Sequence, residues 1–289
     1  MSELYNLKVT RFANGQVEIR KYSDLVGGNT NVKKEWGKYY SSWCCAHAQR
    51  LEVKFEEREK VYNPFTEERE KEISFDKAIK NENDSFKRTK EKVYAYSRQG
   101  MWEYFITITF DPKKADRTNF DLCMDKARNW AKNTKKRYCP NLKYLLVPEL
   151  HSDKKSWHIH GLLMNCDTLP LKDSGKKDKK GRVIYNLNFK GGYNSAIRIG
   201  STKKDIYSIA GYVCKYITKD MCRLTRGKHR YYVSNGIDKP LETFYLCNGT
   251  SEMEDIINTV INSLGLEECY KKVSKGDYLD VEYRYYSEV

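Results

Sequence analysis

Two histidines stand one residue apart in the segment SWHIHGLLMN, residues 156–165. Side chains alternate faces along a β-strand, so His158 and His160 point to the same side, opposite Ile159. Two neighbouring imidazoles can chelate one divalent ion. Glu149 lies nine residues before His158, and a hairpin turn between them places it opposite the pair. Two histidines and one carboxylate leave coordination positions open for water or substrate, as a catalytic metal site requires.

An isolated pair of this kind is more often two inert, hydrogen-bonded strand histidines, because short motifs arise by chance. Glu149 moves that balance only modestly toward a metal site. His151 shares the strand face of Glu149 and is either a fourth ligand or a turn residue, and we favour the turn. Cys44, Cys45 and His47 form a cluster, but no second cluster completes a zinc site at the usual spacing.

A second set of reactive groups lies in YSIAGYVCKYITKD, residues 207–220. On an α-helix, Tyr212, Lys215, Tyr216 and Lys219 fall within about 100° of arc, beside an apolar face. A phenol, with a pKa of about 10, is a weak nucleophile at neutral pH. It becomes effective where a metal polarises the electrophile and cations stabilise the phenolate. The alternative is a helix whose tyrosines pack at a sheet edge, but two overlapping Tyr-x-x-Lys units on one face favour the chemical interpretation.

The elements that must position these groups are predicted from hydrophobic periodicity and turn residues. The predicted strands are residues 103–112, 143–150, 158–164 and 193–200, the helices are 119–138 and 204–221, and residues 7–22 form a hairpin. This order predicts an α+β fold with a central antiparallel sheet of about five strands flanked by α-helices. We expect three parts: an N-terminal hairpin and charged helical region (1–99), a catalytic core (100–230) and an acidic C-terminal region (231–289).

The charge of the chain is basic and unevenly distributed. The net charge is +14, residues 249–289 carry −5, and the first 248 residues therefore carry +19. A basic body with 13% aromatic residues fits a nucleic-acid partner, and solvated lysines on an ordinary soluble protein fit the composition about equally well. Residues 172–182 are predicted as a mobile basic loop. Its candidate DNA-binding residues are Lys176, Lys177, Lys179, Lys180 and Arg182.

Three aromatic residues are candidates for stacking on bases: Trp102, Trp157 and Tyr193. Each is at least as well explained by packing in the sheet. Thr107 and Thr109 share one strand face and either border the site or serve as good strand formers.

The ordered motifs resemble the HUH-endonuclease family of rolling-circle replication initiators over roughly residues 100–222. YFITITF resembles the family's first motif, WHIHGLL its histidine–hydrophobe–histidine metal motif, and YVCKYITK its tyrosine motif in the two-tyrosine form of phage-type initiators. The resemblance implies a sequence-specific single-strand nickase and ligase. It assigns Glu149, His158 and His160 to a divalent metal, for which we expect Mg²⁺ or Mn²⁺.

The resemblance also implies a 5′-phosphotyrosine intermediate. Tyr216 is the expected first nucleophile and Tyr212 the second, with Lys215 and Lys219 supporting the phosphate. The implied partners are single-stranded DNA at a replication origin and a host helicase, because the chain has no G-x-x-x-x-G-K-[ST] segment.

The sequence also bears on location and on alternative functions. No apolar run approaches the roughly 20 residues of a membrane span, and the N-terminus lacks a signal-peptide core. We expect no membrane partner and a place in the cytoplasm of a bacterial host cell. The alternatives are a transposase or relaxase with the same chemistry, or a non-catalytic single-stranded nucleic-acid-binding protein. A zinc hydrolase is a third alternative, but no HExxH helix supports it.

Overall fold

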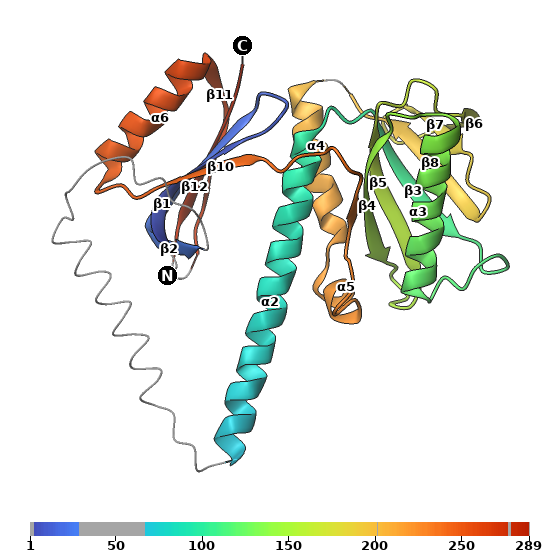
Figure 1. The fold of residues 1–289 in the computed structure, drawn as a ribbon, viewed down its shortest axis with the longest axis horizontal. Helices are drawn as coiled ribbons and strands as arrows, with labels where there is room; N and C mark the ends of the chain where they lie inside the picture. Colours follow the sequence, from blue (N-terminus) through green and yellow to red (C-terminus); the bar gives the residue numbers. More distant parts are fainter. Residues whose placement is uncertain (1–2, 29–66, 201, 277–278, 289) are drawn as a thin grey trace. The chain divides into compact units, whose positions relative to one another are not determined.

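The computed structural model describes residues 3–28, 67–200, 202–276 and 279–288 (Figure 1). Its contacts divide the chain into two compact units. The terminal unit contains Met1–Ser74 and Pro240–Val289, and the central unit contains Phe75–Lys239. The two ends of the sequence therefore share one unit, and all the candidate catalytic residues lie in the other.

The central unit is built on a seven-stranded antiparallel sheet with the strand order β6-β7-β8-β3-β5-β4-β9. This confirms the α+β fold, with two more strands than the expected five or so. Its strands are β3 (Tyr104–Phe110), β4 (Lys143–Leu150), β5 (Trp157–Met164), β6 (Leu171–Lys177), β7 (Val183–Leu187), β8 (Gly192–Arg198) and β9 (Tyr232–Val233).

The prediction of a mobile loop at residues 172–182 was wrong, because the segment forms most of the β6–β7 hairpin. Its turn is organised by Asp178, whose Oδ1 accepts hydrogen bonds from the backbone N–H groups of Lys180 and Arg182. Gly181 takes the positive φ of +78° that the turn requires. A polar composition is compatible with an edge hairpin, since backbone hydrogen bonds rather than apolar burial hold its strands together.

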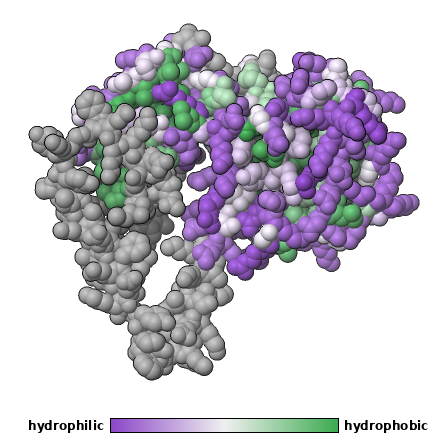
Figure 2. Space-filling view, in the orientation of Figure 1, coloured by the Kyte–Doolittle hydropathy of each residue, from purple (hydrophilic) through white to green (hydrophobic). Residues whose placement is uncertain are grey.

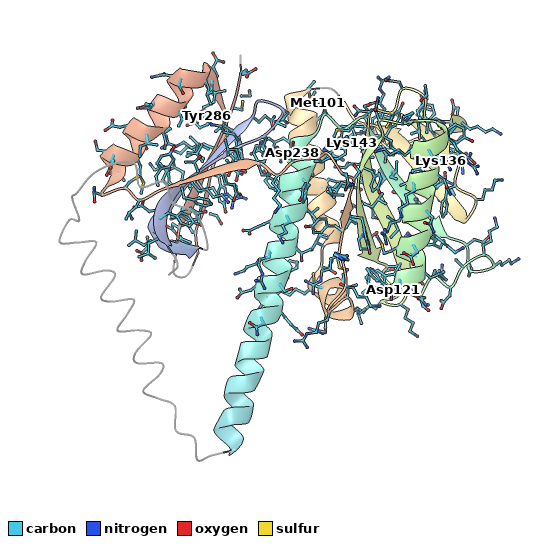
Figure 3. All side chains as sticks on the ribbon, viewed as in Figure 1. Met101, Asp121, Lys136, Lys143, Asp238 and Tyr286 are labelled. Carbon is cyan, nitrogen blue, oxygen red and sulfur yellow. The ribbon has the colours of Figure 1, made fainter. Side chains whose placement is uncertain are left out.

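One face of this sheet is covered by α3 (Phe120–Arg137), as predicted. Asn119 caps the helix, accepting a hydrogen bond from the N–H of Leu122. The helix packs its apolar side against the sheet residues Ile106, Ile108 and Ile159, all fully buried. Its outer side is hydrophilic (Figure 2), and Asp121 and Lys136 lie at opposite ends of it (Figure 3).

The other face is covered by helices on the opposite side of the sheet from α3 (Figure 1). They are α2 (Glu67–Gln99), α4 (Lys203–Val213), the 3₁₀ turn η1 (Cys214–Tyr216) and α5 (Lys219–Leu224). The single helix predicted for residues 204–221 was therefore wrong. The backbone leaves the helical region at Ile217, and Thr218 caps a new helix by accepting a hydrogen bond from the N–H of Met221.

The terminal unit is a five-stranded sheet with the order β10-β1-β2-β12-β11 and one helix, α6. Its elements are β1 (Glu3–Arg11), β2 (Val17–Gly28), β10 (Leu241–Tyr245), α6 (Thr250–Leu264), β11 (Leu266–Ser274) and β12 (Val281–Glu288). The pairing of β1 with β2 confirms the predicted hairpin.

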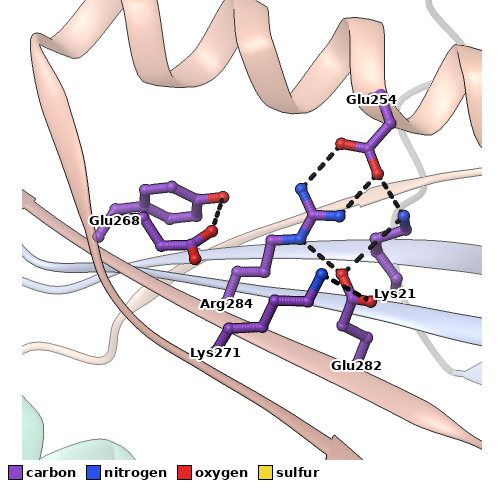
Figure 4. A network of polar contacts seen from close by, with 7 residues as sticks. Lys21, Glu254, Glu268, Lys271, Glu282 and Arg284 are labelled. Atoms are coloured by element: carbon purple, nitrogen blue, oxygen red, sulfur yellow. Dashed lines mark hydrogen bonds and ion pairs between the residues drawn. The ribbon is translucent and has the colours of Figure 1, made fainter.

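A polar network ties α6 to this sheet (Figure 4). Arg284 on β12 donates two hydrogen bonds, of 2.7 and 2.8 Å, to the carboxylate of Glu254 on α6. Lys21 on β2 donates to the same carboxylate. These contacts outweigh the effect of burial and lower the pKa of Glu254 to about 2.

Within the described residues, no helix combines the length and the hydropathy needed to span a bilayer.

Candidate functional site

The candidate metal ligands meet on one face of the three central strands. Glu149 on β4 lies directly opposite His158 on β5, and Val147 lies opposite His160. On the other side of β5, Thr109 pairs with His158 and Thr107 with His160. The predicted hairpin between the two strands therefore places the carboxylate beside both imidazoles.

Each imidazole is fixed by a threonine of β3. The hydroxyl of Thr107 lies 3.1 Å from Nδ1 of His160, and the hydroxyl of Thr109 lies 3.1 Å from Nδ1 of His158. A hydroxyl can donate or accept, so it can follow either tautomer of its ring. With Nδ1 engaged, Nε2 is the nitrogen left for another partner. Nε2 of His160 donates to Oε2 of Glu149 at 2.6 Å.

The charge states of this cluster suit a cation. Burial opposes ionisation of Glu149, but the hydrogen bond and charge of His160 outweigh it and lower the pKa of the carboxyl. Burial and the nearby His151 lower the pKa of His158, which favours its neutral form. An ionised carboxylate and a neutral imidazole are the forms that bind metals.

His151 lies in the turn between β4 and β5, as we favoured, and its side chain is exposed. Its ring nevertheless stacks on that of His158, with centroids 4.6 Å apart. His151 thus covers one side of a candidate ligand.

The two tyrosines approach the cluster from the helical side of the sheet. The ring of Tyr216 stacks on the imidazole of His160, with centroids 3.6 Å apart and planes 10° apart. Tyr212 meets Tyr216 edge to face at 5.5 Å. Burial, followed by the hydrogen bond with Tyr212, raises the pKa of the Tyr216 phenol. The imidazole pair and the phenol pair therefore converge at one place.

Phe105 completes the aromatic contacts and was not singled out from the sequence. It stacks on His160 at 5.6 Å and contacts the edge of Tyr212 at 5.2 Å. The signal was available, because Phe105 shares the strand face of Thr107 and Thr109.

The lysines of the tyrosine segment take separate places. Nζ of Lys215 lies 5.4 Å from the ring centroid of Tyr212, where its charge acts on that phenol. Lys219 begins α5 and lines a basic groove together with Arg88 and Arg226. The break between α4 and α5 separates the two lysines, which one continuous helix would have aligned.

The donor set of Glu149, His158 and His160 fits a divalent cation of the Mg²⁺ or Mn²⁺ type. Within the described ranges, no three His, Cys, Asp or Glu side chains are already arranged to hold a metal ion. The direct contact between His160 and Glu149 accounts for this, since the two donor atoms bond each other. The carboxylate, one third exposed, would have to turn away from His160 to admit an ion. Cys44, Cys45 and His47 lie outside the described residues.

The other predicted nucleic-acid contacts are distributed differently. Trp102 and Trp157 are each only 3% exposed, so they are core residues, whereas Tyr193 is 59% exposed. Lys176, Lys177, Lys179, Lys180 and Arg182 are exposed in the β6–β7 hairpin. Arg182 forms an ion pair with Asp178 at 2.7 Å. Strand β6 is four strands from β5, or about 19 Å at the usual strand spacing.

The fold and the site together define a class: an antiparallel α+β domain with a histidine–carboxylate cluster beside paired tyrosines. Residues 103–221 match the family model for the replication-associated protein of the ORF2 type, which is consistent with a rolling-circle replication protein. The match covers less than half of the 289 residues, and it spans from the start of β3 to α5. Neither the curated proteins nor the solved structures include a significant match to the chain.

Proposed function

We propose that this protein initiates rolling-circle replication by nicking and rejoining single-stranded origin DNA through a 5′-phosphotyrosine intermediate. The observation that carries the proposal is the contact between Tyr216 and His160, which brings a nucleophile to the edge of the candidate metal cluster. The match of residues 103–221 to a replication-associated family supports the same conclusion.

A divalent ion held by Glu149, His158 and His160 would act as a Lewis acid on the scissile phosphate. Thr107 and Thr109 engage Nδ1 of the two imidazoles, so that each Nε2 is left for that role. Phe105 packs against His160 and limits the movement of its ring.

The phenol oxygen of Tyr216 attacks the phosphorus and forms a P–O bond. The bond from phosphorus to the 3′ oxygen breaks, and that oxygen takes the electron pair. The phenol loses one proton and the 3′ oxygen gains one, which leaves a free 3′-hydroxyl to prime synthesis. The covalent link conserves the energy of the phosphodiester, so rejoining requires no nucleotide cofactor.

Tyr212 is the second nucleophile in this proposal. It is 43% exposed, and the ammonium of Lys215 lies over its ring. A tyrosine that is free while its neighbour carries the DNA can cleave a second junction and transfer the strand. The unwound template would come from a host helicase.

The test is incubation of the protein with labelled, origin-containing single-stranded DNA and Mn²⁺, followed by denaturing electrophoresis. We expect a covalent adduct that requires the metal. DNA binding without an adduct under any divalent metal would instead support a non-catalytic binding protein.

A further inference from the structure

A basic groove runs along the central unit between α2 and the segment Lys219–Tyr231. It consists of two adjoining hollows with cavity volumes of about 330 and 450 Å³. Both hollows are lined by Ser85, Arg88 and Arg230, so they form one continuous groove.

The charge of the groove is strongly positive. Among its lining residues, one carboxylate, Glu82, faces seven cationic side chains: Arg88, Lys92, Lys219, Arg223, Arg226, Lys228 and Arg230. Arg223 lies 3.7 Å from Glu82, and Lys228 pairs with Asp121 outside the groove at 2.6 Å. Arg88, Lys92, Lys219 and Arg226 have no acidic partner in the described part of the chain and are exposed.

The groove is held open by Arg230. Its guanidinium donates to the hydroxyl of Ser85 at 2.6 Å and to the carbonyl of Cys222 at 2.8 Å, which joins α2 to α5. The Nε of Arg230 is buried and has no hydrogen-bond partner within the described residues. The floor is therefore preorganised, and the walls carry the unpaired cations.

The shape of the groove fits a linear polyanion better than a small anion. Ser85, Arg88 and Lys92 follow one stripe of α2 at helical spacing. Residues 81–92 of that helix extend about 16 Å, which corresponds to about five phosphates along one strand of a DNA duplex. Tyr231 and His229 supply the aromatic rings of the lining, so charge dominates over base stacking.

We propose that this groove binds the sugar-phosphate backbone of the DNA that flanks the cleaved phosphodiester. Lys219 lines the groove and follows Tyr216 by three residues, so a strand at the tyrosine can continue into it. The inference rests on the proposed function for the identity of the polyanion. It assigns the second lysine of the tyrosine segment to the outgoing strand.

The test compares DNA affinity and its salt dependence for R88A/R226A and wild type, by fluorescence anisotropy without divalent metal. The probes are a mixed-sequence single-stranded oligonucleotide and its duplex. The control is K132A/K136A, which removes two exposed lysines from α3 on the other face of the sheet. We expect the groove variant to lose about tenfold in affinity at low salt and the slope of log K against log salt to fall by about 2.

Three further variants separate charge from structure. R88K/R226K keeps both charges and is expected to restore most of the affinity. The single variants R88Q and R226Q are expected to reduce the slope by about 1 each. The guanidinium groups of Arg88 and Arg226 form no ion pair within the described residues, so thermal unfolding of all variants is expected to match wild type. A larger loss with the duplex than with the single strand would place duplex DNA in the groove, and the reverse would place the single strand there.

The result that overturns the groove is equal affinity and equal slope for R88A/R226A and K132A/K136A. If wild type still forms the covalent adduct in that case, the proposed function stands and the groove alone is rejected. If R88A/R226A loses affinity while wild type forms no adduct with any divalent metal, the groove stands and the nicking activity is rejected.

Discussion

The phenol ring of Tyr216 lies parallel to the imidazole of His160, with their centroids 3.6 Å apart. The two residues belong to a 3₁₀ turn and to a central strand, and they are 56 positions apart in the sequence. Their contact joins the candidate nucleophile to the candidate metal cluster. It also means that the Tyr216 ring must move relative to His160 when DNA enters.

The metal assignment predicts the behaviour of His158→Ala. Removing one of three donors should abolish adduct formation and lower the affinity for Mn²⁺ by at least about 100-fold. DNA affinity should be largely retained, because phosphate contacts elsewhere dominate it. Mn²⁺ binding is measured by electron paramagnetic resonance. His229→Ala, an exposed histidine outside the cluster, is the control for metal binding, and equal loss in both variants would reject the assignment.

The threonine of β3 predicts a smaller, specific effect. Thr107→Val removes the hydroxyl that holds Nδ1 of His160 while keeping the shape of the side chain. We expect Mn²⁺ affinity to fall about 10- to 100-fold. Thr107→Ser restores the hydroxyl and should recover most of the affinity, as isothermal titration can measure. Wild-type affinity in Thr107→Val would show that the hydroxyl does not orient the ligand.

The pKa of His158 predicts a pH dependence of stability. Burial and the positive charge of His151 lower this pKa below its ordinary 6.5, with smaller effects from Glu149, His160 and Arg117. The unfolded chain therefore binds the proton more readily than the folded one. The associated stability is present above pH 6.5 and is lost as the pH falls through the folded pKa.

His151→Ala tests this pH dependence. It removes the ring stacked on His158 and should raise the pKa of His158 toward its ordinary value, as measured by NMR titration of the imidazole. The loss of stability on acidification should shrink accordingly. A pKa of His158 that does not change in His151→Ala would show that the neighbouring ring does not cause the shift.

The strands of the site could be predicted from local patterns. Lys143–Leu150 and Trp157–Met164 alternate or bury apolar residues between clear turn residues, and the short connection fixes their register. The position of Glu149 opposite His158 follows from that register. The threonine face of β3 follows from the same two-residue period.

The break after Val213 could not be predicted from periodicity alone. Ile217 continues the apolar spacing of the helix, yet its backbone is extended, with φ −81° and ψ 105°. The available signal was Thr218 with Asp220 in the next turn, a combination typical of a helix start. Burial of Ile217 in the core decided between the two patterns.

Long-range pairing accounts for the other surprises. Strand β1 pairs with β10, whose residues are more than 200 positions away, so no local pattern indicates the terminal unit. The basic groove likewise depends on residues of α2 meeting residues after α5. Such contacts are fixed by tertiary packing, which composition and spacing do not encode.

The glycine of the histidine strand predicts an effect on stability. A Cβ at Gly161 would lie 2.8 Å from Cδ2 of Leu146 and 3.0 Å from Cγ1 of Ile106. Gly161→Ala should therefore destabilise the protein by about 1–3 kcal/mol through overpacking. Gly211→Ala is the matched control, because a Cβ there meets open space on α4 and should stabilise by about 0.5–1 kcal/mol.

Urea unfolding followed by tryptophan fluorescence measures both glycine variants. Trp102, Trp130 and Trp157 are buried in the core of the central unit and report on it. Equal stability of Gly161→Ala and wild type would mean that the sheet relaxes around the added methyl group.

The most direct test of the central claim is to identify the residue that carries DNA. The covalent adduct is formed with Mn²⁺, digested with protease and nuclease, and sequenced by mass spectrometry. We expect a nucleotide remnant on Tyr216 in wild type, transfer of the remnant to Tyr212 in Tyr216→Phe at a reduced yield, and no adduct in the double Phe variant. An adduct in the double variant, or a remnant on a residue outside the tyrosine pair, would contradict the account.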